Sequence, residues 1–347
     1  MHETIVIWGD EFASYDFGPM HPLRPVRLEL TMALAREVGA LGTANVVAPR
    51  PADQSILELV HTPEYIGAVR EAPHGFYSQL RAYGLGPGDN PIFAGMHEAS
   101  SLVAGASVQA AQAVWDGGVR HAVNISGGLH HAMPSMASGF CIYDDPALAI
   151  AWLLEAGAER VAYVDVDVHH GDGVQAAFYA DPRVLTISIH EAGAGFFPGT
   201  GWREEVGLGA GTGSSMNVPL AAGADDESWH AAFDAEIPER LREFRPQIIV
   251  SQMGCDTHAL DPLAHFDLTL SGQRRTYAKV HALAHELCDG KWVVTGGGGY
   301  DPARIVPRSW AALLAEVTGS NLPETIPENW LSYAKERTGL SVPAHFS

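Results

Sequence analysis

Short apolar runs rich in β-branched residues alternate with longer amphipathic segments along most of this chain. A run without polar residues fits a strand that is covered on both faces, and the segments between runs are long enough for crossover helices. The pattern predicts an α/β fold with a mainly parallel central sheet and helices on both faces. The expected strands are residues 4–8, 122–125, 160–166, 184–189, 247–253 and 292–295, and the expected helices are residues 24–38, 98–115, 146–155, 225–244, 271–288 and 302–318.

The length and composition fit one large domain. The chain has 347 residues, of which 46% are hydrophobic and 18% charged, so it can form a sizeable core and is not a disordered tail protein. No repeat or long polar linker divides it. We therefore expect a single domain over residues 1–347, in which residues 319–347 form an irregular C-terminal cap.

The chain is strongly acidic, with 41 Asp and Glu residues against 21 Lys and Arg and a formal net charge of −20. Such a surface repels phosphate backbones and anionic lipids, so neither nucleic acid nor a membrane is an expected partner, whereas a cationic substrate is tolerated. The first residues, MHETIVIWGDEF, lack the features of a signal peptide, and the three cysteines include no CxxC pair. We expect a soluble, reduced, cytoplasmic protein.

Glycine-rich stretches follow several of the expected strands, at residues 126–128, 170–173, 198–201 and 296–299. In open parallel sheets, ligands bind in the crevice outside the carboxyl ends of the strands. The polar clusters of this chain fall at the same strand ends, so we expect the functional site there.

The densest polar cluster is DVDVHHGDG, which ends an apolar strand. Because side chains alternate along a strand, Asp165, Asp167 and His169 point the same way. Two carboxylates and an imidazole on one face are costly to bury without a cation, and this set suits zinc or a similar ion. A hydrogen-bonded turn with exposed acids is the alternative.

Three further clusters have open interpretations. His130 and His131 in GGLHHAM fit either a general-base pair or an ordinary polar loop. Asp256 follows the expected strand 247–253 after two residues and fits either a metal ligand or a helix N-cap. Tyr300 ends the glycine run TGGGGYDP, where a phenol could donate to a developing oxyanion. The glycines do not have the spacing of a phosphate-binding loop.

Taken in order, HHA, DVDVHHGDG, GFFPGTG, GCDTHALDP and GGGGY resemble the histone deacetylase superfamily, and most of all its bacterial acetoin-utilisation-type and class I-like members. The resemblance runs from YDFGPMHPLRPVR at 15–27 through GLGPGDNPIF at 84–93 to Tyr300. It implies the arginase/deacetylase type of α/β fold. It also implies zinc-dependent hydrolysis of N-acyl amides, mainly N-acetyl, with acetyl-lysine of proteins or peptides as the expected substrate and acetate and a free amine as products.

The resemblance selects Asp167, His169 and Asp256 as ligands of one zinc ion per chain, with Fe²⁺ as the alternative ion in vivo. Positions would stay open for water and the substrate carbonyl, as in catalytic zinc sites.

The same resemblance assigns the acid–base groups. His131, supported by Asp172, would take a proton from the attacking water and later protonate the leaving amine. His130, supported by Asp165, would orient and stabilise charge, and Tyr300 would donate a hydrogen bond to the scissile carbonyl.

For the substrate, the resemblance implies a narrow tunnel with two aromatic walls. Phe140 and Phe197 would enclose the aliphatic stem of a lysine, and the Gly139 carbonyl would accept from the substrate amide. Asp89 would contact a peptide backbone at the rim, and Leu263 matches a class I-like pocket position.

A structural potassium ion is also implied beneath the strand that carries the metal ligands. Its ligands would be Asp165 through side chain and backbone, the carbonyls of Asp167, His169 and Ile189, and the Ser188 hydroxyl. A second potassium site near Phe178, Asp181 and Val184 is a looser match, and Arg27 corresponds to the arginine of an internal channel.

The arginase-type manganese hydrolases share this fold, but their second metal needs carboxylates where this chain has Gly171 and His258. A non-enzymatic acyl-lysine binding module is the alternative from another class, although the chain keeps every expected ligand, both histidines and the tyrosine. The alternative substrates are small acetylated amines such as polyamines, and longer acyl-lysines. The sequence does not indicate an oligomeric state.

Overall fold

The apolar runs form a parallel sheet. The computed structural model describes residues 4–346, and in this part of the chain eight strands pair in the order β2-β1-β3-β8-β7-β4-β5-β6, every neighbour parallel. The strands are β1 Thr4–Ile7, β2 Asn45–Val47, β3 His121–Asn124, β4 Val161–Asp165, β5 Val184–Glu191, β6 Ser215–Leu220, β7 Ile248–Gln252 and β8 Trp292–Thr295. The predicted α/β class and parallel sheet are confirmed.

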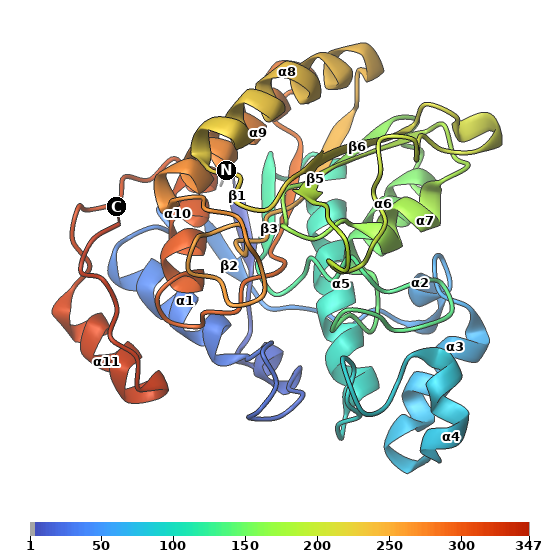
Figure 1. Cartoon of the computed structure of the whole chain (residues 1–347), viewed down its shortest axis with the longest axis horizontal. Coiled ribbons are helices and arrows are strands. Elements are labelled where there is room, and N and C mark those ends of the chain that lie inside the picture. Colours follow the sequence, from blue (N-terminus) through green and yellow to red (C-terminus); the bar gives the residue numbers. More distant parts are fainter. Residues whose placement is uncertain (1–3, 347) are drawn as a thin grey trace.

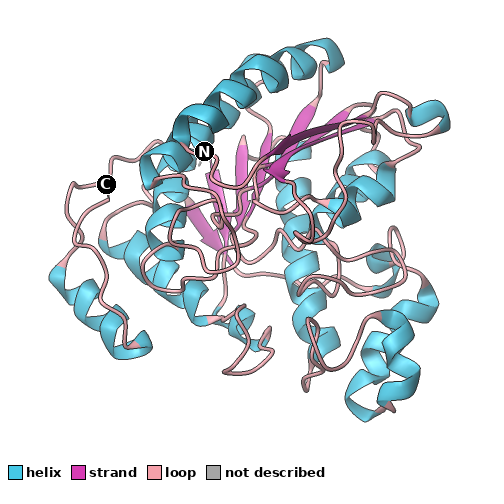
Figure 2. Ribbon diagram, viewed as in Figure 1, coloured by secondary structure: helices cyan, strands magenta, loops and turns pink. Residues whose placement is uncertain are grey.

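Helices cover both faces of this sheet (Figures 1 and 2). One layer contains α5 Met96–Trp115, α6 Asp145–Glu155 and α7 Asp172–Phe178. The opposite layer contains α1 Val26–Glu37, α8 Asp226–Phe244, α9 Leu270–Cys288 and α10 Val306–Thr318. The short helices α2 Gln54–Leu57, α3 Pro63–Glu71 and α4 Tyr77–Leu80 precede α5 in the chain. Because both faces are covered, the central strands β3, β8, β7 and β4 are buried at every residue.

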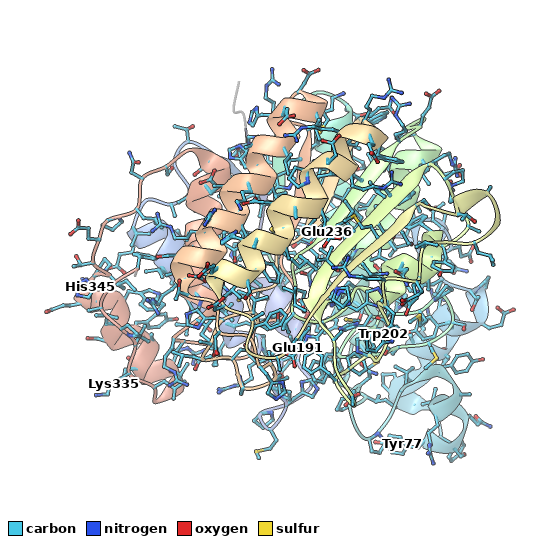
Figure 3. All side chains as sticks on the ribbon, turned by 45° about the horizontal axis from the view of Figure 1, so that its top comes forward. Tyr77, Glu191, Trp202, Glu236, Lys335 and His345 are labelled. Carbon is cyan, nitrogen blue, oxygen red and sulfur yellow. The ribbon has the colours of Figure 1, made fainter. Side chains whose placement is uncertain are left out.

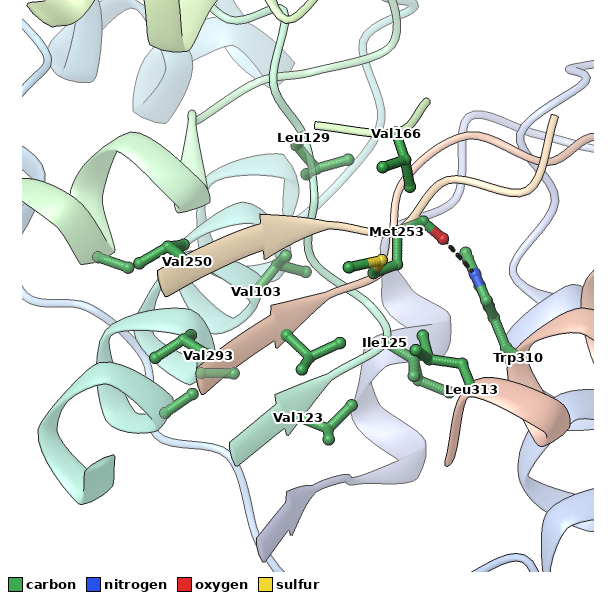
Figure 4. Close-up of a cluster of buried hydrophobic side chains, with 14 of the residues drawn as sticks. Val103, Val123, Ile125, Leu129, Val166, Val250, Met253, Val293, Trp310 and Leu313 are labelled. Carbon is green, nitrogen blue, oxygen red and sulfur yellow. Dashed lines mark hydrogen bonds between the residues drawn. The ribbon is translucent and has the colours of Figure 1, made fainter. Parts of the chain in front are cut away.

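The hydrophobic core extends up to the carboxyl ends of the central strands (Figure 4). Ile125 directly follows β3 and Met253 directly follows β7, and both are fully buried. The Trp310 indole of α10 donates a hydrogen bond to the Met253 carbonyl over 2.9 Å. The loops that begin at these two residues therefore start from packed, hydrogen-bonded positions.

Two sequence predictions about the C-terminal part need correction. The helix expected from residue 302 begins at Val306, because the Asp301 carboxylate accepts the amides of Ala303 and Arg304 in a local turn. The segment 319–347, expected to be irregular, contains α11 Glu328–Thr338. Its Trp330 is buried and donates to the Leu30 carbonyl of α1 over 3.0 Å, so packing stabilises this helix.

The prediction of one domain over residues 1–347 remains a prediction, and residues 1–3 and 347 lie outside the described part. The three cysteine thiols, Cys141, Cys255 and Cys288, are buried and free. Among the helices in residues 4–346, none combines the length and hydropathy that a membrane crossing requires.

Candidate active site

Four neighbouring strands supply the predicted site. His130 and His131 follow β3, residues 165–169 end and follow β4, Asp256 follows β7 and Tyr300 follows β8. These strands are adjacent in the order β3-β8-β7-β4, and their carboxyl ends lie at the same edge of the sheet. The clusters, which are spread in sequence from His130 to Tyr300, are therefore brought together at that edge, as expected for open parallel sheets.

The three predicted metal ligands form a compact buried group. One ligand atom each from Asp167, His169 and Asp256 lies within 4.8 Å of the others. His169 Nδ1 is 3.1 Å from Asp167 Oδ1 and 3.1 Å from Asp256 Oδ2. Burial and the nearby charge of Asp167 raise the pKa of Asp256 to about 8. A divalent cation among these atoms would offset the cost of burying two carboxylates, so the donor set fits zinc.

Backbone and amide groups hold the carboxylates in place. Asp167 Oδ2 accepts hydrogen bonds from Gln252 Nε2 at 2.6 Å and from the Gly298 amide at 2.7 Å. Asp256 Oδ1 accepts from the Val168 amide at 2.9 Å. A Cβ atom on Gly298 would lie 1.9 Å from Asp256 Oδ2, so only glycine allows this close approach. The glycine run after β8 is therefore part of the ligand geometry.

The two histidines have similar partners but opposite electrostatics. His130 Nδ1 is 2.7 Å from Asp165 Oδ2, and His131 Nδ1 is 2.7 Å from Asp172 Oδ1. Burial disfavours a charged His130, but Asp165 and Asp167 outweigh it and raise its pKa to about 9. Burial and the charge of His130 lower the pKa of His131 to about 4 despite Asp172. These surroundings favour the charged form of His130 and the neutral form of His131, whose Nε2 could then accept a proton.

A pocket of about 210 Å³ opens above the metal-ligand group. The five residues predicted to contact substrate line it together with one ligand, one histidine and the tyrosine: Asp89, Gly139, Phe140, Phe197, Leu263, His169, His131 and Tyr300. Asp89 is exposed, and its contact with a substrate backbone stays a prediction. Burial, with Asp256 and Asp167, raises the pKa of Tyr300 well above its usual range, so the phenol keeps its proton and can donate it in a hydrogen bond. The individual roles remain predictions.

The walls of the pocket are held from outside. Phe140 has a positive φ of 69°, which is unusual for a bulky residue. The Tyr15 hydroxyl donates to the Phe140 carbonyl at 2.8 Å and accepts from the Ile142 amide at 3.1 Å, which fixes this conformation. Arg203, six residues after Phe197, pairs with Glu236 of α8 through two hydrogen bonds of 2.7 and 2.9 Å, which links the segment after Phe197 to that helix.

Several residues that shape the site were not predicted from the sequence. The Phe196 ring stacks on His169 at 5.2 Å and 5°. The Tyr163 hydroxyl donates to Asp165 Oδ2 at 2.7 Å. Glu191 accepts from the amide of His265 at 2.9 Å and holds the loop that carries Leu263 (Figure 3). The repeated aromatic in GFFPG was a signal for Phe196, but Tyr163 and Glu191 lie in strand sequences that give no sign of their partners.

The residues predicted for potassium lie together at β4 and β5. The register places Asp165 beside Ser188, with Ile189 next in β5. The Ser188 hydroxyl also bonds His190 Nδ1 at 2.9 Å. For the looser second site, the Val184 amide donates to the Asp181 carbonyl at 3.3 Å. Binding of potassium at either place remains a prediction.

Comparison with known proteins identifies the family. The histone deacetylase domain model matches residues 21–317. The chain belongs to the histone deacetylase family. Among relatives, the acetoin utilization protein AcuC of Bacillus subtilis is 42% identical over 349 residues, covering 100% of this chain and 90% of that protein. The AcuC of Staphylococcus xylosus is 37% identical, covering 99% of this chain and 90% of that protein.

Solved structures agree with this assignment. A histone deacetylase homologue from Aquifex aeolicus has a TM-score of 0.89 and 32% identity, and the match covers 96% of this chain and 88% of that one. A homologue complexed with SAHA also has a TM-score of 0.89 and 32% identity, with 96% and 89% covered. The predicted family and fold are confirmed, and the chain is an AcuC-like hydrolase of the deacetylase family.

Proposed function

We propose that this deacetylase hydrolyses the N-acetyl amide of acetyl-lysine in proteins or peptides and releases acetate and a free amine. The pocket supports this substrate most directly, because one cavity is lined by the exposed Asp89, by the rings of Phe140 and Phe197, and by the polar groups of His131, His169 and Tyr300. An aliphatic stem between Phe140 and Phe197 would bring its amide to the polar end.

We propose one zinc ion, held by Asp167, His169 and Asp256. When bound, it would supply Lewis-acid polarisation of the amide carbonyl and acidify water. The ligand atoms are buried and mutually close, as stated above, and Phe196 packs on the outer side of the His169 ring. We also propose a structural potassium ion at Asp165, Ser188 and the carbonyls of Asp167, His169 and Ile189.

The side chains divide the proton transfers between them. His131 is neutral and its Nδ1–H is committed to Asp172, so Nε2 accepts the proton of the attacking water and returns it to the leaving amine. The positive charge of His130 stabilises the negative charge that develops nearby. Tyr300 donates to the carbonyl oxygen as it becomes an oxyanion, and the Gly139 carbonyl accepts the substrate N–H.

Acetate release from acetyl-lysine peptides tests the function. Tyr300→Phe removes one oxyanion donor and should lower kcat by about 10²–10³-fold with little change in KM. His131→Ala should abolish turnover at neutral pH while zinc content stays at the wild-type level. A variant at a distance, Arg50→Ala, serves as the control because Arg50 is exposed. Full activity of His131→Ala would contradict the proposed acid–base role.

The substrate class is tested with a panel of acyl-lysine peptides and acylated polyamines ranked by kcat/KM. Acetylated small amines are the second candidate, because the net charge of −20 favours cationic molecules. Loss of peptide turnover with retained polyamine turnover would select them, and no release from any substrate would select a binding module.

Metal analysis separates the deacetylase from the arginase-type alternative. Asp256→Asn should contain one zinc ion per chain fewer than the wild type. A loss of two manganese ions per chain would contradict the single-metal site. The structure leaves no room for a longer side chain at position 171, because a Cβ atom on Gly171 would lie 2.2 Å from Asp165 Oδ2.

A further inference from the structure

Three imidazoles converge at the end of the sheet opposite to the active site. His121 is the first residue of β3, and His281 and His285 lie one turn apart on α9. His121 Nε2 is 3.2 Å from His285 Nε2, which is 3.1 Å from His281 Nε2. One ring nitrogen from each histidine lies within 4.8 Å of the other two. The predicted deacetylase mechanism makes no use of these residues.

Hydrogen bonds at the opposite ring nitrogens orient two of the rings. His121 Nδ1 donates to the Val317 carbonyl at 3.1 Å, and His281 Nδ1 donates to Glu316 Oε1 at 2.8 Å. A ring that donates through Nδ1 presents an unprotonated Nε2, and a carboxylate behind a histidine is the usual support of a metal-bound imidazole. Both acceptors belong to the last turn of α10.

The separations of His285 Nε2 from the other two Nε2 atoms suit a tetrahedral ion. Nitrogen ligands about 2.0–2.1 Å from zinc in tetrahedral geometry are about 3.3–3.4 Å apart. The observed separations of 3.2 and 3.1 Å are close to this value.

Neighbouring groups restrain the cluster and leave it accessible. The Trp292 ring stacks on His281 at 5.2 Å and 22° and meets His121 edge-on at 6.0 Å, which restrains both rings. Helices α9 and α10 both end beside the cluster, and helix C-termini carry partial negative charge. A pocket of about 180 Å³, lined by the three histidines and by residues such as Thr4 and Thr318, leads to it from solvent.

We propose that His121, His281 and His285 form a second metal site for a zinc-like divalent transition ion, bound through three Nε2 atoms with a solvent-facing fourth position. All-imidazole ligation selects zinc, copper, nickel or cobalt over magnesium and calcium. The ion would join β3 to α9, with Glu316 of α10 held behind it, and so tie the amino ends of the strands to the helix layer. This inference does not depend on the proposed deacetylase activity.

Zinc content measured after dialysis against buffered zinc tests the site. The wild type should bind one zinc ion per chain more than His285→Ala, and both should deacetylate at the same rate. The control His74→Ala removes another exposed histidine and should keep the wild-type zinc content. His285 is exposed, so its substitution should not unfold the chain, and His281→Ala provides a second variant. Equal zinc content in the wild type and His285→Ala would overturn the proposal.

Asp256→Asn separates this site from the active site. Copper(II) added to Asp256→Asn should give an electron paramagnetic resonance spectrum with coupling to several imidazole nitrogens, and this coupling should disappear in Asp256→Asn/His285→Ala. Zinc should likewise raise the melting temperature of the first protein by several degrees and leave that of the second unchanged. Identical responses from the two proteins would refute the site even if the deacetylase proposal holds.

Discussion

Gly139 is placed where the pocket wall meets His131. Its φ is 50°, and a Cβ atom there would lie 2.5 Å from His131 Cδ2 and 2.9 Å from Phe197 Cε1. His131 cannot move aside freely, because its Nδ1 is bonded to Asp172. We expect Gly139→Ala to lower kcat/KM by about 100-fold, since small misplacements of acid–base groups have effects of this order.

A second glycine separates the clash from the backbone strain. Gly39 has a φ of 71° with nothing near its Cβ position, so Gly39→Ala carries only the cost of the left-handed conformation, about 1 kcal/mol. Steady-state kinetics and melting temperatures of both variants are compared. Equal activity losses in the two would show that contact with His131 does not matter.

At the same scale, the sequence predicted which side chains form the site. The separate roles of His130 and His131 came only from the family resemblance. The two residues are adjacent and each has an aspartate at 2.7 Å. Only His130 also lies near Asp167, whose Oδ1 is 3.9 Å from its Nε2. Asp165 and Asp167 together raise the pKa of His130, and burial together with the charge of His130 lowers the pKa of His131, a difference that no local sequence pattern encodes.

At the scale of elements, Arg27 of α1 connects a helix to the glycine run after β8. Its Nη1 donates to the Gly297 carbonyl at 2.8 Å and the Gly299 carbonyl at 3.0 Å, and its guanidinium lies 4.9 Å from the Trp310 ring. Arg27→Met keeps the buried stem but leaves two buried carbonyls without this donor, which costs about 1–3 kcal/mol each. We expect a lower melting temperature and a lower kcat, because Tyr300 follows Gly299 directly.

Arg50→Met provides the matched control for this element, since Arg50 is exposed and its loss should leave both quantities unchanged. Hydrogen exchange of the amides at 296–300 reports on the glycine run itself. Unchanged exchange in Arg27→Met would mean that packing rather than Arg27 positions Tyr300.

Element prediction from the sequence succeeded where apolar runs are long and failed where tertiary contacts decide. β2 has only three residues, two of them exposed, and pairs with β1 at the sheet edge. β6 mixes Ser215 and Asn217 with apolar residues, because these two buried side chains bond to Thr186 and Gln175. α7 begins at Asp172 within HGDG, a glycine-rich stretch that indicates a loop. The strand order also has no local signal, since β7 and β8 insert between β3 and β4.

At the scale of the whole molecule, buried histidines that are neutral in the folded state make folding less stable at acidic pH. His61 Nδ1 donates to the Met133 carbonyl at 3.2 Å and its Nε2 accepts from the Asp144 amide at 3.0 Å, so both nitrogens need the neutral ring. Burial lowers the pKa of His61 to about 4. Because the folded pKa lies below the unfolded value of about 6.5, the contribution is complete above that pH and is lost as pH falls towards 4.

Urea unfolding of the wild type and His61→Gln at neutral pH and near pH 5 measures this loss. The wild type should lose about 2 kcal/mol more than the variant between the two conditions, because one pKa unit corresponds to about 1.4 kcal/mol. Comparing the two proteins removes the opposing effect of buried carboxyls such as Asp145, whose pKa is raised to about 6 by burial. Parallel pH profiles would rule out His61 as a source of acid sensitivity.

The net charge of −20 should act on the substrate through the whole molecular field. A lysine-rich acetylated peptide is attracted and an acidic one repelled, and salt screens both effects because the Debye length is about 10 Å at 0.1 M. We expect kcat/KM for the lysine-rich peptide to fall roughly tenfold as the salt concentration rises from low to high. Its kcat should stay constant. The kcat/KM for the acidic peptide should rise over the same range. Asp89→Asn should lower kcat/KM for both peptides. The two peptides should still differ in how their kcat/KM changes with salt concentration, because Asp89 supplies only one of many negative charges. If both peptides responded to salt alike in the wild type, the acidic surface would have no part in substrate choice, and selection would rest on the pocket alone.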